Sequence, residues 1–130
     1  NLILEKKNNL KIINNIVHPI VRNKMKNFLK KNKREKAVVL DIPLFLENKL
    51  NRKTDYLIFV NSKKKNINRK IKQRKSNLKL IKRLRKFQLS NKIKRKSADF
   101  IINNNFKKLN VKKNVIIIKK KILKNERSYS

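Results

Sequence analysis

The segment at residues 37–48, AVVLDIPLFLEN, constrains the fold more than any other part of the chain. Its first half, residues 37–42, is a short, nearly continuous apolar run typical of a strand buried on both faces of a parallel sheet. Pro43 lacks a backbone donor and ends such a strand, so residues 44–48 should form the turn at its carboxyl end. Ligands bind at that edge in open α/β sheets. We therefore predict an α/β protein whose ligand site lies beside this turn.

The chain carries a very large positive charge: 40 Lys and Arg residues stand against 7 Asp and Glu residues, for a net charge of +33. Such a charge is typical of proteins that bind nucleic-acid phosphates. However, an excess of Lys, Asn and Ile without any Gly is what AT-rich coding produces in any protein, and the positive residues are spread over the whole length. The six Phe and two Tyr fall mostly at core-like positions, which leaves no platform for stacking bases. We interpret the charge as a solvated surface, with an RNA- or ribosome-binding module as the alternative.

The rest of the composition sets broad limits. At 130 residues the chain is one domain's worth, and without Cys it has neither a disulfide framework nor a thiolate metal site. It shows no apolar run of membrane-spanning length and no signal-peptide pattern, so we expect a cytoplasmic protein without a membrane partner. Because the first residue is Asn1 rather than Met, we also expect a fragment of a longer protein.

Two helices are expected ahead of residue 37. Apolar residues within the first 17 positions are spaced for one helical face. His18-Pro19 should interrupt this helix, because the residue before a proline avoids the helical region. Pro19 suits the first turn of a helix, so a second helix is predicted from Pro19 to the charged run at residues 30–36.

Two further strands are expected, at residues 55–61 and 97–104, where apolar runs end in polar residues. The strand at residues 55–61 could form a hairpin with residues 37–42 or lie parallel to them, and the residues alone leave both arrangements open.

The remaining segments are predicted to be helical. Residues 63–88 have a helical pattern with a break near Ser76-Asn77, and their narrow apolar stripe among many basic residues is typical of a mobile lid. In the tail, residues 106–124, a helix is favoured over a strand because the patterned run is long.

Five segments in order resemble the later part of dephospho-coenzyme A kinase. They are IVHPIVR at residues 16–22, VVLDIPLFLEN at 38–48, DYLIFV at 55–60, a basic helical pair ending in Gln88, and ADFIINNN at 98–105. The resemblance implies an ATP-dependent P-loop kinase that phosphorylates the ribose 3′-hydroxyl of dephospho-coenzyme A, the last step of coenzyme A synthesis. It also implies a partial P-loop kinase fold, with a parallel sheet flanked by helices and a helical lid, which favours parallel strands over the hairpin.

The resemblance further divides the chain by role. Residues 1–62 and 97–130 would form part of the core and substrate-binding region, and residues 63–96 the lid. ATP and Mg²⁺ would be held mainly by an N-terminal part that is missing here, since a chain without Gly cannot contain the phosphate loop GxxxxGK[ST]. The family's catalytic carboxylate would lie in the same missing part. We therefore expect no metal site in these residues and no catalysis by them alone.

The family's substrate-binding positions fall on two segments of the chain. His18 and Arg22 could contact the phosphate-bearing end of the substrate, although His18 could equally cap a helix junction. The turn motif of the family is matched by Pro43, Leu44, Glu47 and Asn48. There Leu44 would line the substrate pocket and Glu47 would fix the loop or touch the substrate. For Asp41 and Phe45 we expect structural roles.

The resemblance places the phosphoryl-transfer and nucleotide contacts on the lid and on the third strand. Arg74 would be the catalytic lid arginine, which stabilises charge on the transferred group. However, counting back from Gln88 puts the family's arginine at position 73, one residue away. Nucleotide-binding roles are implied for Arg69, Gln88, Asn103 and Asn104. For Gln88, Asn103 and Asn104, helix capping and turn formation are the alternatives. A related P-loop kinase with another acceptor is a further alternative.

Overall fold

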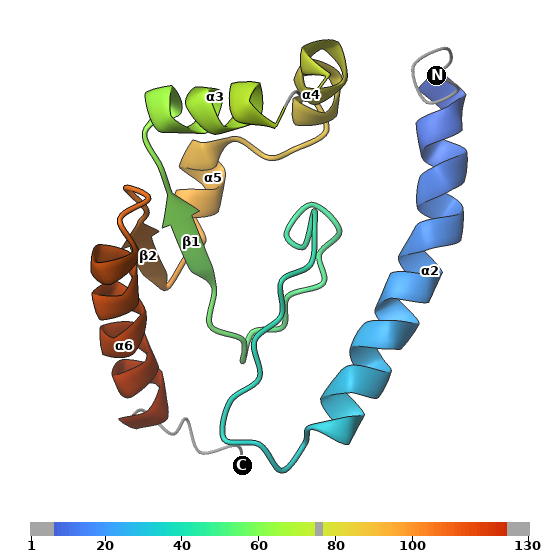
Figure 1. The fold of residues 1–130 in the computed structure, drawn as a ribbon. Helices are drawn as coiled ribbons and strands as arrows, with labels where there is room; N and C mark the ends of the chain where they lie inside the picture. Colours follow the sequence, from blue (N-terminus) through green and yellow to red (C-terminus); the bar gives the residue numbers. More distant parts are fainter. Residues whose placement is uncertain (1–6, 75–76, 125–130) are drawn as a thin grey trace. The chain divides into compact units, whose positions relative to one another are not determined.

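The computed structural model describes residues 7–74 and 77–124, and their side chains except those of residues 7–14 and Arg83. The chain divides into two compact units, Asn1–Ile42 and Pro43–Ser130. Figure 1 shows the helices and strands of the second unit, in which the strands lie next to one another.

The first unit contains one long helix, α2 (Lys7–Lys31), which runs through Pro19 without a break. The predicted interruption at His18-Pro19 is therefore wrong. Proline has a helical φ. Inside a helix it removes the N–H that would bind the carbonyl of Asn15 and its ring crowds that carbonyl, but Asn15 is exposed, so water can replace the missing donor. The helix ends at Lys31, and the next residue, Asn32, caps the last turn, because its side-chain Nδ2 donates to the carbonyl of Phe28 at 2.8 Å.

The predicted strand at residues 37–42 is also wrong. Within the described residues the sheet contains two strands, and residues 37–42 belong to neither of them. Exposed and half-buried residues alternate along this segment, as in an extended chain, and the Val39 side chain is 83% exposed. An apolar run becomes a strand only when a neighbouring strand binds its backbone groups, and the described residues provide no such neighbour here.

The sheet consists of β1 (Ile58–Asn61) and β2 (Phe100–Asn103), which pair in parallel. Both lie inside the predicted strands, so these two predictions are confirmed with shorter bounds. The pairing begins at Asp99, whose backbone N–H donates to the carbonyl of Leu57 at 2.9 Å. The Asp99 carboxylate accepts in return from the Leu57 backbone N–H at 2.8 Å, which fixes the register of the two strands.

Three helices connect the parallel strands: α3 (Lys64–Gln73), α4 (Leu78–Arg85) and α5 (Asn91–Lys96). The first two confirm the predicted helical pair. Their predicted break falls partly on residues 75–76, which lie outside the described residues. The third helix lies within the predicted helical lid, residues 63–96, beyond the helical pattern recognised at residues 63–88. It begins at Asn91 because Ser90 accepts a hydrogen bond from the Ile93 backbone N–H at 3.3 Å.

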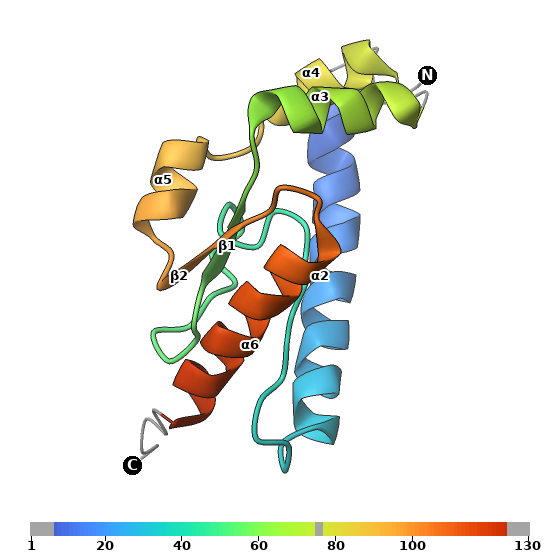
Figure 2. The same ribbon diagram turned by 60° about the vertical axis from the view of Figure 1, so that its left-hand side comes forward.

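The last helix, α6 (Lys108–Lys124), packs on β2 and confirms the helix predicted for the tail. Figures 1 and 2 both show α6 beside the sheet. This contact forms the core: Ile102 of β2 is 7% exposed and Ile118 of α6 is 8% exposed, and they are the buried apolar residues of the described chain. No helix in the described part combines the length and apolar character needed to span a membrane.

The aromatic residues are less buried than their sequence positions predicted. Tyr56 and Phe100 contact each other beside the sheet, with ring centroids 5.7 Å apart. By contrast, Phe28, Phe87 and Phe106 are exposed.

Removing the buried side chain of α6 should destabilise the fold strongly. Ile118→Ala deletes buried methyl groups and leaves a cavity against β2, so we expect a loss of about 3 kcal/mol in the free energy of unfolding, measured by urea titration. The matched control is Leu109→Ala on the same helix, where the side chain is 72% exposed and the change should stay below about 0.5 kcal/mol. Equal losses for the two variants would contradict a core formed by α6 and β2.

Candidate functional site

The site begins with a tight turn at residues 43–49, which follows the extended segment of the first unit. The turn closes on itself: the Asn48 N–H donates to the carbonyl of Leu44, and the Lys49 N–H donates to the carbonyl of Leu46, each at 3.0 Å. Leu44 and Lys49 have φ angles of 57° and 49°, in the left-handed region that residues with a Cβ avoid at a cost of about 1 kcal/mol or more each. A strained backbone of this kind persists only where other contacts hold it.

Glu47 provides the contact between this turn and a distant part of the chain. Its Oε1 atom accepts a hydrogen bond from the backbone N–H of Leu89 at 2.9 Å and lies 2.7 Å from Nζ of Lys94 on α5. The ion pair is largely shielded from water, because the Glu47 side chain is 11% exposed and that of Lys94 is 23% exposed. Of the two roles considered for Glu47, this geometry matches fixation of the loop.

The surroundings of Glu47 favour its charged form. Burial alone would raise the pKa of Glu47, but the hydrogen bonds from Lys94 and from the backbone N–H groups of Glu47 and Leu89, together with the charge of Lys94, outweigh burial. The pKa of Glu47 therefore lies below its ordinary value of 4.5.

A second polar cluster lies where β1 and β2 end. Parallel strands bring their carboxyl ends to the same edge, and here Nδ2 of Asn61 donates to Oδ1 of Asn103 at 2.9 Å. The hydroxyl of Ser62 donates to the carbonyl of Asn104 at 3.0 Å, and the Asn104 N–H donates to the carbonyl of Asn61 at 2.7 Å. Asn104 also caps the next turn, because its Oδ1 accepts from the Phe106 N–H at 2.8 Å. The predicted Asn103 and Asn104 thus come together with two residues that the sequence did not single out.

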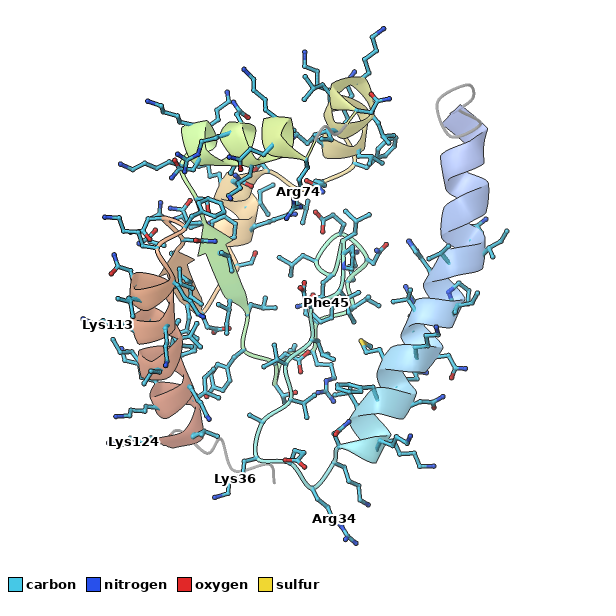
Figure 3. All side chains as sticks on the ribbon, viewed as in Figure 1. Arg34, Lys36, Phe45, Arg74, Lys113 and Lys124 are labelled. Atoms are coloured by element: carbon cyan, nitrogen blue, oxygen red, sulfur yellow. The ribbon has the colours of Figure 1, made fainter. Side chains whose placement is uncertain are left out.

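The lid residues occupy helix α3 and the segment after α4. Arg69 is exposed on α3, and Arg74 is the exposed residue that ends the helix, with its N–H bound to the carbonyl of Lys70 at 3.2 Å. Figure 3 labels Arg74 at the end of α3 that leads to α4, and Phe45 in the turn. Gln88 is exposed and immediately precedes Leu89, so it lies next in sequence to the point where Glu47 is bound.

Lys70 connects α3 to the strand-end cluster. Its Nζ atom lies 5.8 Å from the ring centroid of Phe106, a cation–π distance, and Phe106 is the residue whose N–H binds Asn104. The start of the lid and the carboxyl edge of the sheet are therefore adjacent.

His18 and Arg22 both lie on α2, in the first unit. Four residues apart, they share one face of the helix, where His18 is half-buried and Arg22 is exposed. Because Pro19 does not break the helix, the alternative of His18 as a helix-junction cap does not apply. The turn and strand-end clusters belong to the second unit, so the two sets of predicted residues are placed separately.

A comparison with protein-family models decides what these features belong to: the dephospho-CoA kinase model matches residues 1–110. The chain belongs to the dephospho-CoA kinase family. A curated dephospho-CoA kinase from Fusobacterium nucleatum subsp. nucleatum is 35% identical over 105 residues, 80% of this chain and 54% of the relative. Those of Bartonella henselae and Bartonella quintana are each 32% identical, over 89% of this chain and 61% of the relative. The chain thus spans little more than half the length of these relatives, and no solved structure matches it.

Membership of the dephospho-CoA kinase family explains the α/β arrangement. A parallel pair of strands with flanking helices, as described above, is consistent with a partial P-loop kinase fold and confirms the predicted fold class. The residues present do not match the phosphate-binding loop and metal site of such a kinase. The chain has no Gly for a phosphate loop, and the described residues contain no group of three His, Cys, Asp or Glu residues that could hold a metal ion.

The stability that Glu47 provides should depend on pH in one direction. Because its native pKa lies below 4.5, the value for the unfolded chain, this stability is fully present above pH 4.5 and is lost as the pH falls through the native pKa. In urea unfolding, wild type and Glu47→Gln should differ by about 2 kcal/mol near neutral pH and converge as the pH falls through the native pKa of Glu47. Glu35→Gln, at an exposed glutamate, is the control and should have little effect at either pH. A difference that stays constant with pH would contradict a lowered pKa.

Glycine at the end of the turn should stabilise it. Lys49 is exposed and its φ angle is 49°, so Lys49→Gly removes a steric penalty and should raise the free energy of unfolding by about 1 kcal/mol. Lys53 is also exposed in a turn but is not among the positive-φ residues, so Lys53→Gly should lower it by a few tenths, up to about 1 kcal/mol. Destabilisation by both variants in urea titration would mean that the turn does not hold this backbone conformation.

Proposed function

We propose that the protein is a kinase that transfers the γ-phosphate of ATP to the ribose 3′-hydroxyl of dephospho-CoA. The observation that carries the proposal is the family match over residues 1–110, together with relatives named dephospho-CoA kinase that align with 80 to 89% of the chain. Both substrates are metabolites of the cell interior, and we propose a cytoplasmic location for the protein.

In this proposal the turn and α2 bind the acceptor. Leu44 is held outside the usual backbone region, beside Pro43, and its half-buried side chain would provide an apolar wall for the substrate. The exposed guanidinium of Arg22 and the imidazole of His18 share one face of α2 and would bind the phosphate-bearing end. Asn48, half-buried in the same turn, would add a polar contact.

The lid and the strand ends would bind the nucleotide. Asn103 and Asn104 lie at the carboxyl edge of the sheet, where α/β proteins bind ligands, and the lid begins directly beside them. Together with Gln88 they would border the adenine. The exposed guanidinium groups of Arg69 and Arg74 are free to approach a phosphate, and a lid arginine stabilises the charge that spreads over the transferred group.

We further propose that the phosphate loop, the Mg²⁺ ligands and the catalytic carboxylate lie outside these 130 residues, so that the chain alone does not catalyse phosphoryl transfer. The absence of Gly from the sequence and the length of the relatives support this.

The assay that tests the function measures ATP consumption by the full-length gene product. Consumption should depend on dephospho-CoA, should be absent with a nucleoside such as adenosine as acceptor, and should be undetectable with the 130 residues alone. Activity with the nucleoside in preference to dephospho-CoA would favour a related P-loop kinase. Binding of RNA with a steep salt dependence, without kinase activity, would favour the nucleic-acid interpretation of the charge.

The register of the lid arginine can be tested in the same assay. Arg74→Ala should lower kcat by about 100-fold or more, as expected for a group that stabilises transition-state charge. Gln73→Ala, at the position that the family spacing favours, and Arg85→Ala, an exposed arginine on α4, should each change kcat by less than about threefold. A large loss for Arg85→Ala and none for Arg74→Ala would remove Arg74 from the proposed site.

A further inference from the structure

The contact of Glu47 with residues 89 and 94 joins two regions that the proposed function treats separately. The turn at residues 43–49 is assigned to the acceptor, and α5 is the last helix of the segment assigned to the lid, residues 63–96. Leu89 precedes the Ser90 cap of α5, and Lys94 lies one turn into the helix. A single carboxylate oxygen therefore holds both the segment that enters α5 and the helix itself.

We propose that Glu47 is a positioning residue whose carboxylate, bound to the Leu89 N–H and to Lys94, acts as a lock. The lock holds the acceptor-binding turn at residues 43–49 against the last part of the lid, Leu89 and α5. The inference rests on the proposed function, because it assumes that the turn binds the acceptor. It replaces the alternative in which Glu47 touches the substrate, since the contacts of Oε1 are with the protein.

The backbone of the turn explains why such a lock is needed. Leu44 and Lys49 are both in the left-handed region, and Glu47 lies between them in the sequence. A short segment with two such residues relaxes unless it is held from outside. Release of Glu47 would let the turn relax and would move Leu44, the proposed wall of the acceptor pocket, without touching the groups at the strand ends.

The chemistry of the contact suits a lasting lock. Two charge-assisted bonds in a site with little water are stronger than a surface ion pair, which contributes little. An ion pair with a lysine would not by itself make the position of Glu47 specific, because lysines are abundant in the chain. The additional backbone N–H of Leu89 makes the geometry specific.

The test is a double-mutant cycle on the full-length gene product, with KM measured for dephospho-CoA and for ATP. Glu47→Gln keeps an acceptor for the Leu89 N–H but loses the ion pair, and Lys94→Met loses the same ion pair from the other side. Each should raise the KM for dephospho-CoA by about tenfold with the KM for ATP within about twofold, and the double variant should be no worse than either single variant. The controls are Lys92→Met on α5 and Glu35→Gln, both at exposed residues, which should leave both KM values unchanged.

Each alternative outcome has its own signature. If Glu47→Gln raised the acceptor KM but Lys94→Met did not, Glu47 would touch the substrate and the lock would be overturned. If the two effects multiplied in the double variant, they would be independent and the lock would again be overturned. Wild type without any activity that depends on dephospho-CoA would overturn the proposed function, and this inference with it. Should Glu47→Gln fail to fold, Lys94→Met still decides: an unchanged acceptor KM contradicts the lock.

Discussion

The parallel pairing of β1 with β2 is the interaction on which the second unit depends. Its register brings Asn61 opposite Asn103, and Ile102 of the same strand forms the core with α6. Parallel strands cannot be joined by a tight turn, so the chain must cross from the end of one strand to the start of the next. In this protein the crossover consists of α3, α4 and α5. The segment interpreted as a lid is therefore also the connection that makes the sheet parallel.

Three of the seven carboxylates of this basic chain share a common use. Asp55 accepts from the backbone N–H of Arg52 at 2.8 Å, Asp99 from that of Leu57 at 2.8 Å and Glu47 from that of Leu89 at 2.9 Å. In a chain with 40 Lys and Arg residues, a carboxylate finds a cation almost anywhere, so ion pairing alone specifies little. A hydrogen bond from one particular backbone N–H is specific. It fixes a turn in the case of Asp55, the strand register in the case of Asp99, and the contact of the 43–49 turn with α5 in the case of Glu47.

Local sequence patterns predicted the parts of the fold that local forces decide. The apolar runs around Ile58 and Phe100 became strands, and the long pattern ending at Lys124 became a helix. The prediction of a strand at residues 37–42 was wrong because strand pairing depends on a partner that composition does not reveal. The predicted break at Pro19 was wrong because a long helix tolerates one missing hydrogen bond at an exposed position. Among the site residues, Asn103 and Asn104 could be anticipated from the resemblance. Asn61 and Ser62 could have been found from the polar pair that follows the strand, whereas the partners of Glu47 depend on tertiary contacts.

Four side-chain hydrogen bonds of the second unit share one sequence separation. Leu57 with Asp99, Asn61 with Asn103, Ser62 with Asn104 and Glu47 with Leu89 are each 42 residues apart. The first three bonds close nearly the same loop, so its closure entropy is lost once, by whichever of the three forms first, and the other two then form at little additional entropic cost. Because that loop is long, its closure is a slow event in folding compared with the formation of the helices. The bonds that set the sheet register and those at the strand ends should consequently form and break as one cooperative set, whereas the Glu47 bond closes a loop of its own.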